Sequence, residues 1–135
     1  MGKVIYSKIN VIPQEKGDIF KLLTKDSMHF DKFGEAYYSN IKFNEIKGWK
    51  KHLKMQCVLL PVSGDVDVVT LNLDSNRFEK FNLNIKTPHR LVIPPNIIFA
   101  FRGNEINNCV LNITNILHDP EESLTFNLNE FKYNW

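Results

Sequence analysis

The sequence predicts an all-β domain of jelly-roll type, and three observations support this prediction. No segment carries a long run of apolar residues at the spacing of an amphipathic helix. Short apolar or alternating runs recur along the chain, separated by turn signals about every 8–12 residues, which is typical of a β-sandwich or barrel. Hydrophobic residues make up 43% of the chain and include ten Phe, so a packed core can be filled.

The elements are expected in the following order. The chain enters with a strand and a short apolar run at 18–23 that suits either a strand or a helix. In the run at 66–73 the alternation changes phase near Val68, which predicts a β-bulge. Pro120 suits a loop or the first position of a helix. We expect strands at residues 4–11, 35–43, 57–62, 66–73, 78–85, 90–93, 97–101 and 109–113.

Length and charge narrow the class of protein. With 135 residues the chain fits one domain, residues 1–135. No apolar run approaches the roughly 20 residues of a membrane span, and the first residues lack the apolar block of a signal peptide. A net charge of +2, with dispersed basic residues, argues against nucleic-acid binding. We therefore expect a cytoplasmic protein that binds neither nucleic acid nor membrane.

The two cysteines lie inside apolar, strand-like runs. Cys57 and Cys109 show no C-x-x-C spacing and no Cys/His pattern. We expect buried free thiols in place of a disulfide or a zinc site.

A cationic stretch is the candidate working face. Between Lys47 and Lys54 the chain carries four Lys and one His around Trp49, and an apolar strand follows directly. Cations on a rigid base suit an anionic ligand, and His52 is the one member able to move a proton near neutral pH. A basic loop with solvated lysines is the alternative that residue types alone leave open.

Five short motifs occur in an order that resembles the dTDP-4-dehydrorhamnose 3,5-epimerase family. They are Lys-Gly-Asp-Ile-Phe at 16–20, Tyr-Tyr-Ser at 37–39, Ile-Lys-Gly-Trp at 46–49, Val-Ser-Gly-Asp-Val at 62–66 and Leu-Val-Ile-Pro-Pro at 91–95. The resemblance implies a cupin-type jelly roll that acts on a nucleoside-diphosphate-linked 4-keto sugar in surface-polysaccharide biosynthesis. It also implies a homodimer joined by N-terminal strands and proton-transfer chemistry without a metal or another cofactor.

The chain departs from the family pattern at the positions that would perform catalysis. Lys50 stands where the family has its catalytic His, and His52 follows two residues later on the same face of an extended segment. Phe99 replaces a second His, and Asn112 replaces the family's acid/base Tyr. The supporting Asp falls near Asn129, so we expect the His-Asp pair to be absent. A His-x-His pair, which metal-binding cupins and the related sugar 3,4-ketoisomerases carry, is also missing, and this argues against a metal site and against a metal-dependent isomerase.

Seven residues are candidates for the site. We expect His52 and Lys50 to be the catalytic groups. Each of the others has a structural alternative: Trp49 can cap the barrel, Arg102 can be a surface charge, and only one of Tyr37 and Tyr38 can face inward. The candidate substrate-binding residues are Lys47, Trp49, Tyr38, Arg102 and Asn112.

Two classes of function remain open. The first is a metal-independent sugar-nucleotide epimerase or isomerase. The alternative is a non-catalytic cupin that binds a sugar nucleotide or saccharide, which the missing His-Asp pair favours. A dimeric partner protein of a sugar-modifying enzyme is a weaker third possibility.

Overall fold

The computed structural model describes residues 2–135 and confirms the all-β prediction. These residues form twelve strands and one short 3₁₀ turn, with no α-helix. In order they are β1 (Ile5–Lys8), β2 (Asn10–Ile12), β3 (Ile19–Lys21), β4 (Glu35–Lys42), β5 (Ile46–His52), β6 (Cys57–Ser63), β7 (Asp65–Asn72), β8 (Arg77–Asn84), β9 (His89–Ile93), β10 (Ile98–Gly103), β11 (Asn107–Thr114), η1 (Pro120–Glu122) and β12 (Ser123–Thr125).

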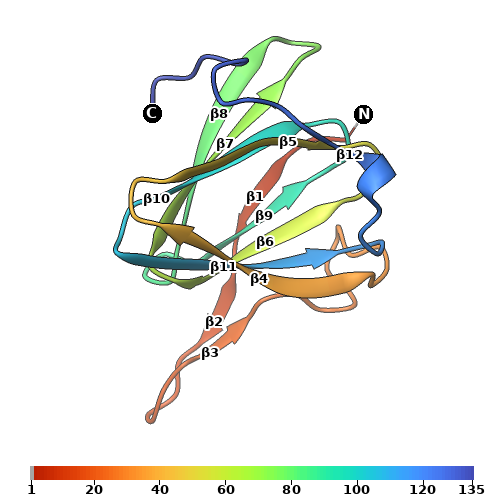
Figure 1. The fold of residues 1–135 in the computed structure, drawn as a ribbon. Helices are drawn as coiled ribbons and strands as arrows, with labels where there is room; N and C mark the ends of the chain where they lie inside the picture. Colours follow the sequence, from red (N-terminus) through yellow and green to blue (C-terminus); the bar gives the residue numbers. More distant parts are fainter. Residues whose placement is uncertain (1) are drawn as a thin grey trace.

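Ten of the strands form two antiparallel five-stranded sheets that face each other (Figure 1). Sheet I has the order β1-β9-β6-β11-β4, and sheet II has the order β12-β5-β10-β7-β8. The main core lies between them and includes Leu59, Val68 and Phe99. This arrangement confirms the predicted jelly-roll sandwich. Strands β2 and β3 pair separately as a hairpin that projects from the sandwich (Figure 1).

Strand β7 corrects one sequence prediction. Its register with β8 and with β10 runs without a shift, so the bulge predicted near Val68 is wrong. The change of phase arises because β7 is buried on both faces. Val66 and Val68 belong to the core between the sheets, whereas Val69 and Leu71 pack in a second apolar cluster outside sheet II. A strand that is covered on both sides has no polar face to keep its alternation regular.

Strand β5 contains the irregularity that was expected in β7. Phe99 pairs with Lys50 and Phe101 pairs with Lys47, so β5 uses one more residue than β10 between these two pairs. Lys47 and Lys50 are three positions apart and would point to opposite faces of a regular strand. The extra residue brings both onto the inner face. At Gly48 a Cβ atom would lie 2.4 Å from the Ala100 Cβ, so only glycine allows this approach.

The C-terminal segment covers the outer face of sheet II. After η1 and β12 it carries aromatic side chains back over the sheet, where they pack on Trp49 and on partly buried Phe78. Four aromatic side chains anchor this segment: Phe126, Phe131, Tyr133 and Trp135. Asp119 caps η1 by accepting a hydrogen bond from the Glu121 backbone N–H, and Pro120 stands at its start.

Candidate active site

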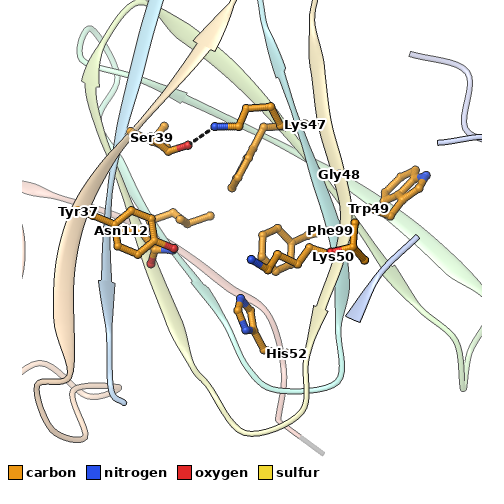
Figure 2. Close-up of a pocket in the computed structure, with 13 residues that line it drawn as sticks. Tyr37, Ser39, Lys47, Gly48, Trp49, Lys50, His52, Phe99 and Asn112 are labelled. Atoms are coloured by element: carbon orange, nitrogen blue, oxygen red, sulfur yellow. Dashed lines mark hydrogen bonds between the residues drawn. The ribbon is translucent and has the colours of Figure 1, made fainter. Parts of the chain in front are cut away.

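A cavity of about 280 Å³ lies between the sheets, with β4 and β11 on one side and β5 and β10 on the other (Figure 2). Lys47 and Tyr37 are exposed members of its lining, so the cavity reaches solvent beside them. His52 is buried and lies deeper. The lining residues are Tyr37, Ser39, Lys47, Gly48, Trp49, Lys50, His52, Leu59, Phe99, Phe101, Val110, Asn112 and Thr125.

The basic side chains of β5 enter this cavity in the order in which the strand presents them. Lys47 lies at the exposed end, where its Nζ donates to Ser39 Oγ at 2.8 Å and to the Asn40 carbonyl at 3.1 Å. Lys50 comes next and lies near Phe99 in Figure 2. His52 follows, with its ring stacked on that of Phe99 at a centroid distance of 6.0 Å. The cationic stretch is thus part of a cavity wall, and the solvated-loop alternative does not apply to these residues.

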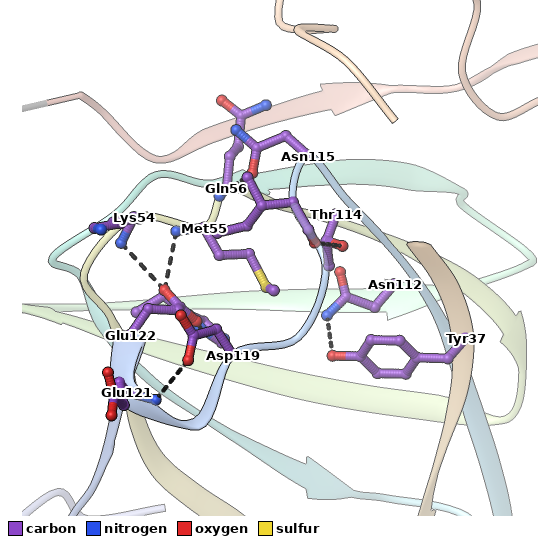
Figure 3. Close-up of polar contacts among 12 residues, drawn as sticks. Tyr37, Lys54, Met55, Gln56, Asn112, Thr114, Asn115, Asp119, Glu121 and Glu122 are labelled. Carbon is purple, nitrogen blue, oxygen red and sulfur yellow. Dashed lines mark hydrogen bonds and ion pairs between the residues drawn. The ribbon is translucent and has the colours of Figure 1, made fainter. Parts of the chain in front are cut away.

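His52 is paired with a buried carboxylate that sequence reasoning did not find. Its Nδ1 lies 2.5 Å from Glu122 Oε1. The second carboxylate oxygen, Oε2, accepts the backbone N–H groups of Lys54 and Met55, each at 3.1 Å (Figure 3). The sequence analysis considered only a His-Asp pair, whereas the structure pairs His52 with a glutamate. Glu122, at the end of η1, occupies the supporting role expected near Asn129.

The charges of this pair follow from its surroundings. Burial lowers the pKa of His52 below its ordinary value, and this outweighs the opposing effect of the Glu122 hydrogen bond. Burial alone would raise the pKa of Glu122, but the hydrogen bonds from His52, Lys54 and Met55 together lower it. At neutral pH the imidazole is neutral and the carboxylate is ionised. Nδ1–H then donates to Glu122, which leaves Nε2 as an acceptor.

Tyr37 and Asn112 form the polar part of the opposite wall. They are direct cross-strand partners on β4 and β11. Asn112 Nδ2 donates to Tyr37 Oη at 2.8 Å. Burial raises the pKa of Tyr37, so the phenol keeps its proton at neutral pH. The cavity therefore holds a neutral imidazole base on one side and a phenolic hydroxyl on the other (Figure 2).

Three of the candidate substrate-binding residues do not direct their side chains into the cavity, although Trp49 is part of its lining. Tyr38 points away from the cavity and is 68% exposed, whereas its neighbour Tyr37 faces inward. Arg102 does not line the cavity, and its Nη2 donates to Asn44 Oδ1 at 3.1 Å. The predictions for Tyr38 and Arg102 are corrected for the same reason. Side chains point alternately to the two faces of a strand, and the sequence did not show which set of alternate residues in β4 and β10 faces inward.

Trp49 is the third correction. Its side chain is 1% exposed and points to the outer face of sheet II. The indole packs near Phe78, Phe131 and Trp135, and its Nε1 donates to the Leu128 carbonyl at 3.3 Å. Stacking on a ligand is excluded by this burial. Trp49 therefore has a structural role, but a different one from the barrel cap that the sequence suggested: it fixes the C-terminal segment.

Two functional candidates were missed in the sequence, and each had a weak signal. Glu122 lies in the run His-Asp-Pro-Glu-Glu at 118–122, which carried the helix-start signal of Pro120. Tyr37 belongs to the quoted Tyr-Tyr-Ser motif, but its neighbour was chosen. His118 is an exposed residue whose charge contributes to lowering the pKa of His52, after burial and after the charge on Lys50.

Beyond the cavity, three further properties of the described residues bear on function: the cysteines, possible metal sites and possible membrane spans. Both cysteines are free; Cys57 is buried, and Cys109 is only partly so. Residues 2–135 contain no group of three or more His, Cys, Asp or Glu side chains placed to hold a metal ion. None of the elements formed by these residues is a helix with the length and apolar character of a membrane span.

No protein-family model and no curated protein sequence matches the chain. Solved structures do match it. A dTDP sugar isomerase from Desulfovibrio desulfuricans G20 is 27% identical, with a TM-score of 0.89 over 98% of this chain and 90% of that chain. The sugar 3,4-ketoisomerase QdtA from Thermoanaerobacterium thermosaccharolyticum, solved with TDP, is 19% identical, with a TM-score of 0.79 over 95% and 90% of the two chains. A dTDP-4-dehydrorhamnose 3,5-epimerase from Sulfolobus tokodaii is 15% identical, with a TM-score of 0.85 over 96% and 80%.

The fold and the cavity therefore define a cupin-type β-sandwich with a polar site between its sheets. More particularly, the fold is that of the RmlC-like cupins, the group that contains dTDP-sugar isomerases and 3,5-epimerases. The resemblance inferred from the sequence motifs is confirmed at the level of the fold.

Proposed function

We propose that this protein is an isomerase of a dTDP-linked 4-keto sugar, working by proton transfer at the carbon next to the keto group. The observation that carries the proposal is the buried His52–Glu122 pair, which leaves a neutral imidazole nitrogen available on the wall of a cavity. A general base near its working pH, held in one tautomer by a carboxylate, is what removal of such a proton requires.

The first chemical step follows from the positions of three side chains. His52 Nε2 accepts the proton from C3 of the sugar, and the electron pair of the C–H bond moves onto the C4 oxygen. The resulting enolate oxygen needs a donor or a positive charge. The Tyr37 hydroxyl and the Lys50 ammonium group supply these from the facing walls of the cavity.

The direction in which a ligand enters follows from exposure. Lys47 is at the exposed end of the cavity and His52 at the buried end. We assign the diphosphate of the substrate to Lys47 and the sugar ring to the space between His52 and Tyr37. The volume of about 280 Å³ lies near the small end of ligand pockets, which suits one sugar ring with the nucleotide outside.

The fate of the proton decides the product. Its return to C4, with transfer of the O3 proton to the C4 oxygen, gives a 3-keto sugar, and its return to the opposite face of C3 gives an epimer. Two comparisons favour ketoisomerisation: the 27% identical structure is a dTDP sugar isomerase, and the match covers 90% of each isomerase chain but 80% of the epimerase chain.

Proton NMR of dTDP-4-keto-6-deoxyglucose mixed with the protein tests this function. A 3-keto product is the expected result, and a C3 epimer would assign the same site to epimerisation. Binding of the sugar nucleotide without any conversion would overturn the enzymatic proposal and would support the non-catalytic cupin.

We also propose that the protein works as a homodimer through the β2–β3 hairpin. The hairpin projects from the sandwich and exposes Ile19 by 47% and Phe20 by 37% (Figure 1). Light scattering after size exclusion should give a dimer for the wild type and a weaker dimer for Phe20→Asp. Ile106→Asp, at an 80% exposed site between β10 and β11, is the control that should remain dimeric. A monomeric wild type would refute this assembly.

The cellular role proposed here is modification of nucleotide sugars in the cytoplasm for surface-polysaccharide synthesis. Deleting the gene should change the sugar composition of that polysaccharide. An unchanged composition would contradict the role while leaving the chemistry of the site open to direct assay.

A further inference from the structure

The direction of one hydrogen bond limits what the Tyr37 hydroxyl can do. Asn112 Nδ2 carries hydrogens and no acceptor lone pair, so Tyr37 Oη is the acceptor of this 2.8 Å bond. The hydrogen of the phenol must then point to another group. Because Tyr37 lines the cavity, this hydrogen is free to be donated to a ligand atom there (Figure 2).

The surroundings of the amide support this orientation. Asn112 is 4% exposed, and its Oδ1 is buried without a hydrogen-bond partner within residues 2–135. The Cys57 thiol lies beside the same amide, and burial raises its pKa to about 11. A hydrogen bond from Asn112 acts to lower the pKa of the thiol, against the larger effect of burial, so the N–H side of the amide faces the sulfur.

The backbone holds the two side chains in this relation. Asn112 pairs directly with Tyr37 on one side and with Leu59 of β6 on the other. A central strand with partners on both sides gives its side chains little freedom, whereas β4 is an edge strand. The position of Asn112 is therefore fixed by its strand, and the hydrogen bond from Asn112 in turn restrains the Tyr37 side chain.

We propose that Asn112 is a positioning residue that fixes the Tyr37 hydroxyl as a hydrogen-bond donor toward the C4 oxygen of the keto sugar. The proposal rests on the proposed function for its catalytic consequence. Asn112 does not touch the reacting atoms. It ensures that Tyr37 offers its hydrogen to the carbonyl and to the enolate that forms from it, which is the preorganisation that stabilises such a charge.

The kinetic test compares two single variants with their combination. Asn112→Leu should lower kcat by roughly 10–100-fold, as loss of an orienting partner does, with little change in KM. In the Tyr37→Phe protein, Asn112→Leu should have no further effect on kcat, because the hydroxyl that it positions is gone. Two effects that multiply would overturn the proposal.

Thr114→Val is the matched control. Thr114 lies two residues along β11, is 1% exposed and bonds to the Glu35 and Ile116 carbonyls, away from the cavity. Its replacement by Val should reduce thermal stability but leave kcat unchanged. A loss of kcat equal to that of Asn112→Leu would show that both variants act only through the stability of the strand.

A second readout does not depend on activity. The Asn112 hydrogen bond acts to lower the pKa of Tyr37, against the larger effect of burial. NMR titration of labelled tyrosine side chains should therefore show a higher Tyr37 pKa in Asn112→Leu and no change in Thr114→Val. An unchanged or lower Tyr37 pKa would refute the direction of the bond. If the wild type converts no keto sugar, the proposed function fails, and this titration alone decides the orientation.

Discussion

Glu122 reaches His52 across 70 positions of the chain, and its carboxylate is held by two backbone N–H groups before it meets the imidazole. Glu122→Gln should lower the rate of proton exchange by roughly 10–100-fold, because the imidazole loses the charged acceptor that fixes its tautomer. The rate of solvent exchange into the bound keto sugar measures this. Glu121→Gln changes an exposed neighbour and should have no effect. Equal loss in both variants would assign the effect to η1 as a whole.

The same pair gives the protein a defined response to acid. His52 has a folded-state pKa below its ordinary 6.5, so the unfolded chain binds more protons as the pH falls through that value. Glu122 also has a lowered pKa, and its contribution is present above its ordinary 4.5 and is lost as the pH falls through the folded-state value. The contribution of this pair to stability should therefore be constant near pH 7 and should decline below about 6.5.

Urea unfolding at a series of pH values measures this dependence. His52→Gln should remove the part of the decline that begins near the ordinary histidine pKa, and Glu122 should account for a later part. Stability that increases on acidification from pH 7 to pH 5 would contradict the assignment of a neutral His52.

At the scale of single residues, the sequence identified His52 as the candidate base but did not identify its partners. His52 could be predicted because it is the one group in the cationic stretch that titrates near neutrality. Glu122 could not, because a contact over 70 positions depends on where η1 docks. Tyr37 and Tyr38 are neighbours that point to opposite faces of β4. Because β4 is an edge strand with aromatic residues on both faces, its sequence does not reveal which face is the inner one.

Among the elements, β5 determines the geometry of the site, because its extra residue turns Lys47 and Lys50 to the same side. Gly48→Ala should destabilise the protein by about 1–3 kcal/mol, since the new Cβ would lie 2.4 Å from the Ala100 Cβ. Thermal unfolding measures the loss. Adding Ala100→Gly removes the opposing methyl group and should restore part of the stability. No recovery in the double variant would show that the close approach is not the cause.

The outer face of sheet II gives a second prediction at this scale. Trp49→Ala should cost about 3–5 kcal/mol of stability, because a fully buried indole and its hydrogen bond to Leu128 are lost. Affinity for dTDP, measured by calorimetry on the folded fraction at low temperature, should not change. Trp49→Phe is a milder variant that can be used in the same measurement if Trp49→Ala does not fold. Weaker dTDP binding by Trp49→Phe, with its fold intact, would restore the ligand-stacking role.

Most strand positions could be predicted because short runs and turn signals are local, but β5 and β12 were not among the expected strands. The irregularities could not be predicted. The phase change in β7 arises from burial on both faces, and in the sequence such a change looks like a bulge. The actual bulge is in β5 at Gly48, where a glycine in a stretch rich in charged residues looks like a loop in the sequence. The outer face of β7 is buried by the distant C-terminal segment, and the sequence of β7 alone does not show this.

For the whole molecule, the jelly-roll architecture followed from the absence of helical periodicity and from the order of five motifs. The architecture in turn places β4 and β5, which are not paired with each other, on opposite sides of one cavity. This is why an imidazole from sheet II and a hydroxyl from sheet I line the same cavity. The route of η1 and the C-terminal segment around sheet II was not predicted, because their anchors are aromatic residues spaced without a period.

The central claim is that His52 removes a proton from the carbon beside the keto group. The most direct measurement is incorporation of solvent deuterium at C3 of dTDP-4-keto-6-deoxyglucose, compared between the wild type and His52→Ala. We expect rapid incorporation with the wild type and a rate lower by roughly 10²–10⁴-fold with His52→Ala, while dTDP affinity stays nearly the same. Equal incorporation by both proteins, with the sugar nucleotide bound to each, would contradict the account.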